Sequence, residues 1–347
     1  MIYKNRSKLY WINLSPLLLI VIILVSFSGC SNQGKSDELK PKISIVNVPA
    51  DILTMGAYFL AEEITKKSEG KIKPKVYHSG VLSGGKGIAE IEMCQQGSIE
   101  IHITTTAYLA NLVPKTSIVS LPFLFRNIDQ VIGLTKSYSP VLEVINKELN
   151  GKSLHIIAWW PRGFRQLTNS KRPVKTIDDL KGLTFRVMNN PLYTDIMNVM
   201  GANPVPMEWS EVYNALQLKT IDGQENAEDV ISTNKLYETQ KYMTVWDYST
   251  DIEVVLVSFS WWNNLTAEQR KIIQEVADAS IDYQVGLLKK NISDLRKLIE
   301  EKGMEINYIS EENKAAFREA VEPVWIKYEK IFTKQLLEDF MDEIQNY

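Results

Sequence analysis

Short apolar runs alternate with longer helical patterns along most of this chain. Residues 43–46 and 72–76 have the pattern of strands, and residues 55–68 between them have a helical pattern that Gly70 ends as a cap. Three more β-rich runs lie at residues 154–159, 183–187 and 253–258. Strands that alternate with helices predict an α/β architecture with mostly parallel strand pairing.

Capping signals place several further elements. Thr176 and Asp179 have the capping-box spacing of a short helix, and Gly182 ends that helix before the next strand. Arg186 therefore falls near the end of a strand, where α/β folds place ligand-binding groups.

A second cap is expected at Ser210, opening a helix over residues 211–218. Its buried stripe would consist of Val212, Ala215 and Leu216. Trp209 would then lie at a loop tip, pointing towards the same crevice as Arg186.

The last third of the chain is helical in pattern. Thr266 and Gln269 form a capping box, and the pattern that follows runs to Lys302, roughly 50 Å at 1.5 Å per residue. A second helical pattern begins after Ser310 and continues almost to the C-terminus.

The N-terminus has the pattern of a bacterial lipoprotein signal. Basic residues precede a short apolar run at residues 17–25, and Phe-Ser-Gly then leads to Cys30. We expect residues 1–29 to be removed, Cys30 to carry lipid that holds the protein on the membrane, and residues 30–42 to be a tether. The alternative is a transmembrane anchor, but the apolar run is short for a bilayer.

Size and charge limit the remaining possibilities. Residues 43–347 exceed what one core usually supports, so two lobes are expected. Without Lys4, Arg6 and Lys8 of the leader, 36 Lys and Arg (39 − 3) oppose 42 Asp and Glu, a net charge of −6. This balance argues against nucleic acid as a partner.

Cysteine and histidine usage predicts neither a disulfide nor a metal site. With Cys30 lipidated, only Cys94 remains, and it is expected to pack as a small apolar side chain on a helix. His78, His102 and His155 are too far apart in sequence to suggest a metal site. We expect no cofactor, and a monomer.

Two arginines are the best candidates for chemistry. Arg165 and Arg186 each present a planar fork that can hold a carboxylate at two points. No nucleophile, GxSxG elbow or His/Asp/Ser constellation accompanies them, and the carboxylates Asp222 and Glu225 are expected to be solvated turn residues. The pattern therefore favours binding an organic acid over transforming it.

Five segments in sequence carry a family resemblance: GAYFLAEEITKKSEGKI, GSIEIHITTTAYLANLVP, LPFLFRN, LKGLTFRV and IDGQEN. Their order resembles the solute receptors of tripartite ATP-independent periplasmic (TRAP) transporters, the dicarboxylate-receptor (DctP) family, from Ile43 onward. The resemblance implies a two-lobed periplasmic-binding-protein fold of the Venus-flytrap type, with a long helix spanning both lobes. The lobes are expected to divide as residues 43–162 with 252–291, and residues 163–251 with 292–347.

The resemblance also implies a ligand site. Arg186 matches the family arginine that pairs with the ligand carboxylate, and Arg165 matches a second basic position that either contacts ligand or braces the site. Asn226 matches an asparagine that hydrogen-bonds ligand, and Trp209 an aromatic that packs on ligand or caps the core. Four further positions align with cleft-lining residues: Asn189, Asn47, Tyr248 and Thr105.

Alternative interpretations of these residues remain. Arg186 and Arg165 can instead form structural salt bridges, and Asn226 can form an Asx turn. Gly84, Gly85 and Gly87 resemble an anion-binding loop, but the interpretation we favour is a flexible loop at the rim of the cleft.

Taken together, these features predict an extracytoplasmic receptor that delivers an organic acid to the small and large membrane subunits of a TRAP permease. A sugar acid, a C4-dicarboxylate or a keto acid would each satisfy one arginine fork. The alternative within the binding class is a lipoprotein that presents the same acid to a membrane sensor kinase.

Overall fold

The structure of the chain is a computed structural model that describes residues 38–137 and 139–347. For residues 291–293 only the backbone is described. The predicted signal peptide and Cys30 lie outside the described residues, as does most of the predicted tether.

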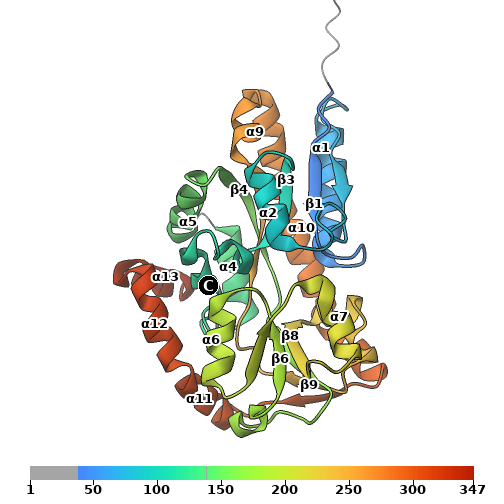
Figure 1. The fold of residues 1–347 in the computed structure, drawn as a ribbon. Coiled ribbons are helices and arrows are strands. Elements are labelled where there is room, and N and C mark those ends of the chain that lie inside the picture. Colours follow the sequence, from blue (N-terminus) through green and yellow to red (C-terminus); the bar gives the residue numbers. More distant parts are fainter. Residues whose placement is uncertain (1–37, 138) are drawn as a thin grey trace, which may run out of the picture. The chain divides into compact units, whose positions relative to one another are not determined.

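The first lobe is built on a five-stranded sheet with the order β2-β1-β3-β10-β4 (Figure 1). Its strands are β1 (Lys42–Ile45), β2 (Lys75–Tyr77), β3 (Ile101–Thr105), β4 (Leu154–Pro161) and β10 (Ile252–Ser258). Its helices are α1 (Ile52–Lys67), α2 (Gly87–Gln95), α3 (Thr106–Leu109), η1 (Pro114–Ser120), α4 (Ile128–Lys136), α5 (Pro140–Asn150) and α9 (Phe259–Asn264).

Helices cover both faces of this sheet, which explains the continuous apolar run of β10. Val254 and Leu256 pack into one hydrophobic cluster, with residues of α2 and α5. Val255 and Val257 point to the opposite face and pack with residues of α1 and the long helix α10 (Ala267–Glu301). A strand covered on both faces has no polar face to alternate with.

The second lobe is built on a six-stranded sheet with the order β11-β9-β5-β8-β6-β7. Its strands are β5 (Arg165–Asn169), β6 (Thr184–Val187), β7 (Asn203–Pro206), β8 (Gly223–Ala227), β9 (Tyr242–Val245) and β11 (Glu305–Tyr308). The helical segments between these strands are η2 (Ile177–Leu180), α6 (Pro191–Val199), α7 (Trp209–Gln217), α8 (Glu228–Thr233) and η3 (Leu236–Glu238).

The predicted α/β class and two-lobed fold are confirmed, but the strand pairing is mixed. β5 runs antiparallel to β8 and β9, and β10 runs antiparallel to β3 and β4. These two strands follow the segments that cross between the sheets, residues 162–164 and 246–251. Neighbouring strands are parallel when a right-handed crossover within one sheet connects them. A strand that enters from the other lobe is not connected in this way, so it can pair antiparallel.

The long helix α10 spans both lobes. Near its start it packs against α1 and β4, and near its end it packs against α8. Ile299 joins the apolar cluster of the second lobe, which contains the expected stripe Val212, Ala215 and Leu216. The capping box of Thr266 and Gln269 is present at its first turn.

Other boundaries differ from the sequence prediction. The capping box of Thr176 and Asp179 is present. The helix expected over residues 211–218 begins two residues earlier, at Trp209, so Ser210 lies inside it and is not its cap. The C-terminal helical pattern is broken into α11 (Glu311–Ala320), α12 (Glu322–Phe332) and α13 (Lys334–Ile344). Thr333, at φ 66°, turns the chain so that α13 packs against α4 and α5.

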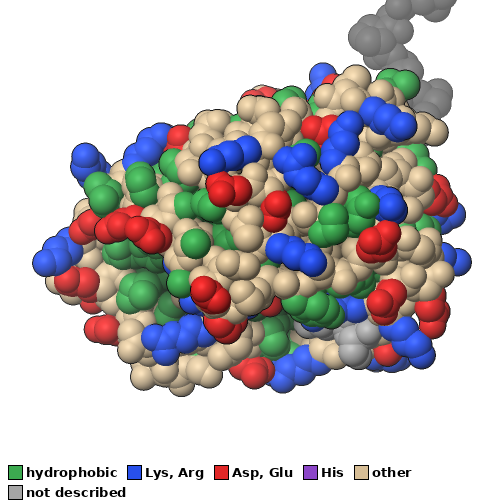
Figure 2. Space-filling model, turned by 90° about the horizontal axis from the view of Figure 1, so that it is seen from below, with side chains coloured by type: hydrophobic (Ala, Val, Ile, Leu, Met, Phe, Trp, Pro, Cys, Tyr) green, Lys and Arg blue, Asp and Glu red, His purple; other side chains and the backbone are tan. Residues whose placement is uncertain are grey.

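The surface carries charges of both signs. Lys, Arg, Asp and Glu side chains are interspersed over the face that Figure 2 shows. Within residues 38–137 and 139–347, no helix combines the length and hydropathy needed to cross a bilayer.

Gly56 allows the close packing of α1 on α10. A Cβ at this position would lie 1.9 Å from Nε2 of Gln284 and 2.7 Å from the ring of Trp160. Both side chains are held in place, because Gln284 donates to the carbonyl of Ile52 at 3.0 Å and Trp160 donates to Ser280 Oγ at 2.8 Å. The contact therefore joins the first sheet to the helix that connects the lobes.

We expect Gly56→Ala to lower the free energy of unfolding by roughly 1–3 kcal/mol, since it overpacks a filled core. The matched control is Gly286→Ala on α10, where a Cβ meets nothing within 4 Å. That substitution should stabilise the protein by roughly 0.5–1 kcal/mol through helix propensity. Urea denaturation followed by circular dichroism measures both, and equal stabilities for the two variants would contradict this packing.

Candidate ligand site

Arg186 lies on β6, a strand of the second sheet that is paired in parallel with β7 and β8. Gly182, at φ 75°, ends the short helix before it and directs the chain into the strand. The strand is buried, and Arg186 is its next-to-last residue, with 1% of its surface exposed. Its charge therefore lies inside the protein, at the carboxyl end of parallel strands.

The guanidinium of Arg186 is only partly satisfied by the protein. Its Nε donates to the carbonyl of Met207 at 3.0 Å, and its Cζ lies 5.5 Å from the centroid of the Trp209 ring. Nη1 and Nη2 are buried and have no hydrogen-bond partner among the described residues. Burial lowers the pKa of this group, Tyr108 opposes the shift, and the neighbouring Arg165 lowers the pKa further.

Arg186 lines a cavity of about 60 Å³ between the two lobes. Residues of the first lobe that line it include Asn47, Thr105 and Tyr108, and residues of the second lobe include Trp209 and Asn226. Five of the eight ligand-binding candidates thus surround one cavity: Arg186, Asn226, Trp209, Asn47 and Thr105.

The polar residues of this cavity retain free hydrogen-bonding groups. Asn226 Oδ1 accepts from the backbone N–H of Ala227 at 3.1 Å, so its amide donors have no partner among the described residues. The Thr105 oxygen accepts from Ala107 N–H at 3.1 Å, which leaves the hydroxyl proton to donate elsewhere. Free donors on residues that line a cavity suit an oxygen-rich ligand.

Arg165 is placed differently from Arg186. It is buried at the start of β5 and is held by two carboxylates, those of Glu225 and Asp251. Its Nη2 also donates to the carbonyl of Glu225 at 2.7 Å, and the ring of Tyr193 lies 5.2 Å away. All of its nitrogens are engaged by the protein, and it does not line the Arg186 cavity.

Two other candidates also lie outside this cavity. Tyr248 is fully buried and donates to Glu225 Oε2 at 2.8 Å, so it belongs to the network around Arg165. Asn189 donates to Glu208 Oε1 at 2.9 Å, and its carbonyl accepts from Asn111 of the first lobe at 2.8 Å.

The expectation that Glu225 is a solvated turn residue is wrong. Glu225 lies within β8, is fully buried and is bound by Arg165. Asp222, three residues before Glu225, accepts a hydrogen bond from the backbone N–H of Thr184 at 2.9 Å. The segment IDGQEN is strand rather than turn from Gly223 onward, because β8 is paired on both sides.

Arg162 is a central residue that the sequence interpretation missed. It lies on the segment that crosses between the sheets, is 4% exposed, and lines the cavity together with Glu253. Its guanidinium contacts Asp229 at 2.8 Å, Glu253 at 3.1 Å and Asp51 at 3.2 Å. One arginine between carboxylates of both lobes joins the lobes at the hinge.

The titration of this cluster reflects its burial. Burial alone would lower the pKa of Arg162, but Asp229, Asp51 and Glu253 raise it. Burial raises the pKa of Glu253 to about 7, against the effect of Arg162. An arginine within the otherwise apolar segment WWPRGF was the sequence signal for this role.

Cys94 and His102, both within the described residues, are buried. Cys94 is buried on α2 as predicted, and burial raises the pKa of its thiol. His102 is buried beside Ser44, and burial lowers its pKa to about 3. No cluster of three His, Cys, Asp or Glu side chains suited to a metal ion is found in the described part of the chain.

Comparison with known proteins agrees with this geometry. The family described as "Bacterial extracellular solute-binding protein, family 7" (DctP) matches residues 43–331. A solute-binding protein of Chromohalobacter salexigens is 30% identical over 286 residues, which are 82% of this chain and 83% of that protein. The C4-dicarboxylate-binding protein DctB of Bacillus subtilis is 28% identical, covering 89% of this chain and 88% of its own length.

A solved structure extends the likeness to three dimensions. The sugar acid binding protein DctPAm of Advenella mimigardefordensis, in complex with galactonate, superposes with a TM-score of 0.84 at 30% identity. The match covers 89% of this chain and 99% of that protein. The chain therefore belongs to bacterial extracellular solute-binding protein family 7, the extracytoplasmic receptors of TRAP transporters, and is a receptor and not an enzyme.

Proposed function

We propose that this receptor captures an organic acid through one carboxylate on Arg186 and delivers it to a TRAP permease. The observation that carries the proposal is the buried guanidinium whose two terminal nitrogens have no partner in the described residues. The protein would be held at the membrane by lipid on Cys30 and would act as a monomer.

The free atoms of Arg186 suit a carboxylate. Its Nε is bound by Met207, so Nη1 and Nη2 remain as a two-pronged donor at the end of the side chain. A ligand carboxylate can accept from both nitrogens at once, and such charged pairs are about twice as strong as neutral hydrogen bonds. Binding would also remove the cost of leaving a buried charge without a partner.

The residues around Arg186 define the class of acid. Trp209 presents an apolar ring, and Asn226 and Thr105 offer donors to ligand oxygens. A sugar acid, a C4-dicarboxylate and a keto acid all satisfy this arrangement. Galactonate in DctPAm and the name of the Bacillus subtilis relative are examples of the first two.

Arg165 is proposed to position the site rather than bind ligand. Glu225 and Asp251 already occupy its guanidinium, and Glu225 lies on β8 next to Asn226. Holding β5 and β8 together in this way orients the amide of Asn226.

Hydrogen bonds and close contacts also join the two lobes in this structure. Asn111 of the first lobe donates to the carbonyl of Asn189, and Asn190 of the second lobe donates to the carbonyl of Ala107, each at 2.8 Å. Gly85, at φ 85°, lies against Ser210 at the start of α7. Ligand that contacts both lobes would favour this closed arrangement over an open one.

Transport is proposed and sensing is not, because the family match identifies transporter receptors and nothing observed favours a sensor kinase.

We predict that Arg186→Ala lowers acid affinity about 100-fold, the equivalent of about 2.7 kcal/mol. Arg186→Lys should not restore the affinity, because an ammonium cannot donate as a planar fork. Isothermal titration calorimetry with galactonate, glucuronate, succinate and pyruvate measures the effect on whichever acid binds. The matched control is Arg318→Ala, which removes an exposed arginine on α11 and should leave affinity unchanged. Unchanged affinity in both Arg186 variants would remove this residue from the site.

We further predict that Gly85→Ala weakens acid binding about tenfold or more, because its Cβ would lie 2.6 Å from Cβ of Ser210 and hinder closure. Gly84→Ala is the matched control: it has a similar positive φ of 67°, and its Cβ meets nothing within 4 Å. Both alanines carry about 1–2 kcal/mol of backbone strain, so only the contact with the second lobe differs.

A compensating change sharpens this test. Ser210→Gly should restore most of the affinity lost in Gly85→Ala, since it removes the side chain that the new Cβ meets. Equal acid affinities for the Gly84 and Gly85 variants would show that this contact plays no part in closure.

A further inference from the structure

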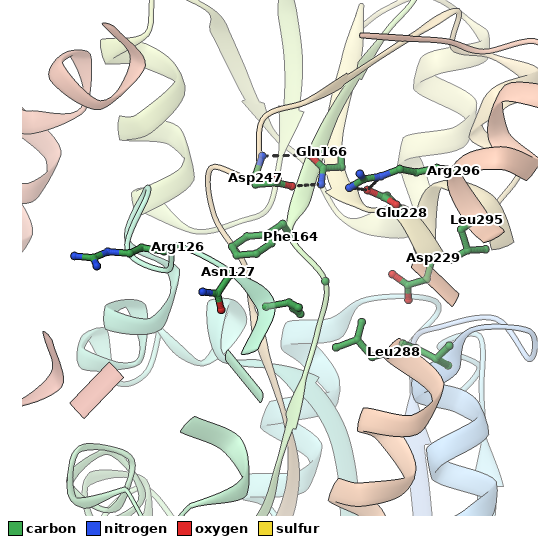
Figure 3. A pocket seen from close by; sticks show the side chains of 13 residues that line it. Arg126, Asn127, Phe164, Gln166, Glu228, Asp229, Asp247, Leu288, Leu295 and Arg296 are labelled. Carbon is green, nitrogen blue, oxygen red and sulfur yellow. Dashed lines mark hydrogen bonds and ion pairs between the residues drawn. The ribbon is translucent and has the colours of Figure 1, made fainter. Parts of the chain in front are cut away.

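A second cavity, of about 270 Å³, is lined by part of the segment 162–164 that joins the lobes (Figure 3). It shares no lining residue with the Arg186 cavity. Gly163 and Phe164 of the crossing segment line it, whereas Arg162, just before them, lines the Arg186 cavity. The α8 region separates the cavities in the same way, with Asp229 on one side and Val230 on the other.

Both lobes and the long helix supply the apolar walls of this hinge cavity. Ile52 and Ile128 come from the first lobe, Phe164 from the crossing segment, and Leu288 and Leu295 from α10. Walls of this kind, with a few polar groups among them, are typical of sites for small organic molecules.

Glu228 gives the hinge cavity an unsatisfied negative group. It is 6% exposed, and Arg296 of α10 binds only its Oε1, from Nε at 2.8 Å and from Nη2 at 2.6 Å. Oε2 is buried and has no hydrogen-bond partner among the described residues. Burial raises the pKa of Glu228, and the charges of Asp247 and Asp229 add to the shift although Arg296 opposes it. A carboxylate oxygen in this position lacks a donor.

The other charged residues of the cavity do not supply that donor. Asp229 and Asp247 add two more carboxylates, one bound by Arg162 and the other by Gln166 at 2.6 Å. In Figure 3 the side chain of Arg126 points away from Glu228 and Asp229. The lining therefore has three carboxylates, and the guanidinium groups that contact them, Arg296 with Glu228 and Arg162 with Asp229, are already engaged.

We propose that the hinge cavity is a second ligand site, which takes a small organic amine. Its ammonium group would donate to Oε2 of Glu228, near the charges of Asp229 and Asp247. Its apolar body would lie against Phe164, Ile128 and Leu288. An organic acid would be repelled from this site by the same carboxylates that favour an amine.

An amine bound at this site would affect how the two lobes move relative to each other. An amine in the cavity contacts both lobes and α10, so it would stabilise the arrangement seen in this structure. Asp229 also joins the two cavities through its 2.8 Å contact with Arg162, which holds Asp51 of the first lobe and Glu253 beside the acid site.

Benzylamine is a suitable probe, and benzyl alcohol is its uncharged control. Saturation-transfer NMR titrations of the full-length chain should show saturable binding of benzylamine, and binding of benzyl alcohol at least tenfold weaker. Glu228→Gln should weaken benzylamine about tenfold or more, since the amide removes the charge but still accepts from Arg296. Glu300→Gln, an exposed change on α10, is the matched control and should have no effect.

Ile128→Phe provides an independent variant that leaves all charges in place. Ile128 is partly exposed at the start of α4, and a larger ring there should fill the cavity and abolish benzylamine binding. Acid binding at Arg186 is measured in parallel, so failure of one site is distinguished from failure of the other. Benzylamine binding that does not saturate, or that both variants leave unchanged, would overturn the proposal, as would equal binding of benzyl alcohol.

Discussion

A buried guanidinium that no described carboxylate neutralises is the constraint on which the rest of this structure depends. Arg186 is held on a central strand, its Nε is fixed by Met207, and it lines a cavity. Removing such a group from water costs free energy that the protein itself does not recover. On the function we propose, an anion supplied from outside would pair with this group.

Three buried arginines of this chain differ in the partners that surround them. Arg162 and Arg165 are each surrounded by protein carboxylates, whereas Arg186 has none within contact distance among the described residues. The paired arginines lie on or beside the crossing segment, where they join strands and lobes. The unpaired arginine lies where the lobes meet. A ligand that binds Arg186, as we propose, would therefore not have to displace a structural ion pair.

Local patterns allowed much of the fold to be predicted. Capping boxes at Thr176 and Thr266 and the apolar stripe of α7 depend on neighbours in sequence, and all three are present. The errors concern partners distant in sequence: β5 and β10 are antiparallel because the chain crosses between lobes, and Glu225 is buried because Arg165 lies opposite it. The resemblance to known receptors singled out Arg186, Asn226 and Trp209, and these three residues line one cavity. It could not indicate that Arg165 is satisfied or that Arg162 joins the lobes, since both facts depend on where carboxylates from other segments lie.

The most direct test is a crystal structure of the protein grown with an acid that binds it in solution. We expect one ligand carboxylate at about 2.7–3.0 Å from both Nη1 and Nη2 of Arg186. Arg165 should remain bound to Glu225 and Asp251. A ligand bound elsewhere, or an Arg186 paired with a protein carboxylate while ligand is present, would show that Arg186 does not bind the acid.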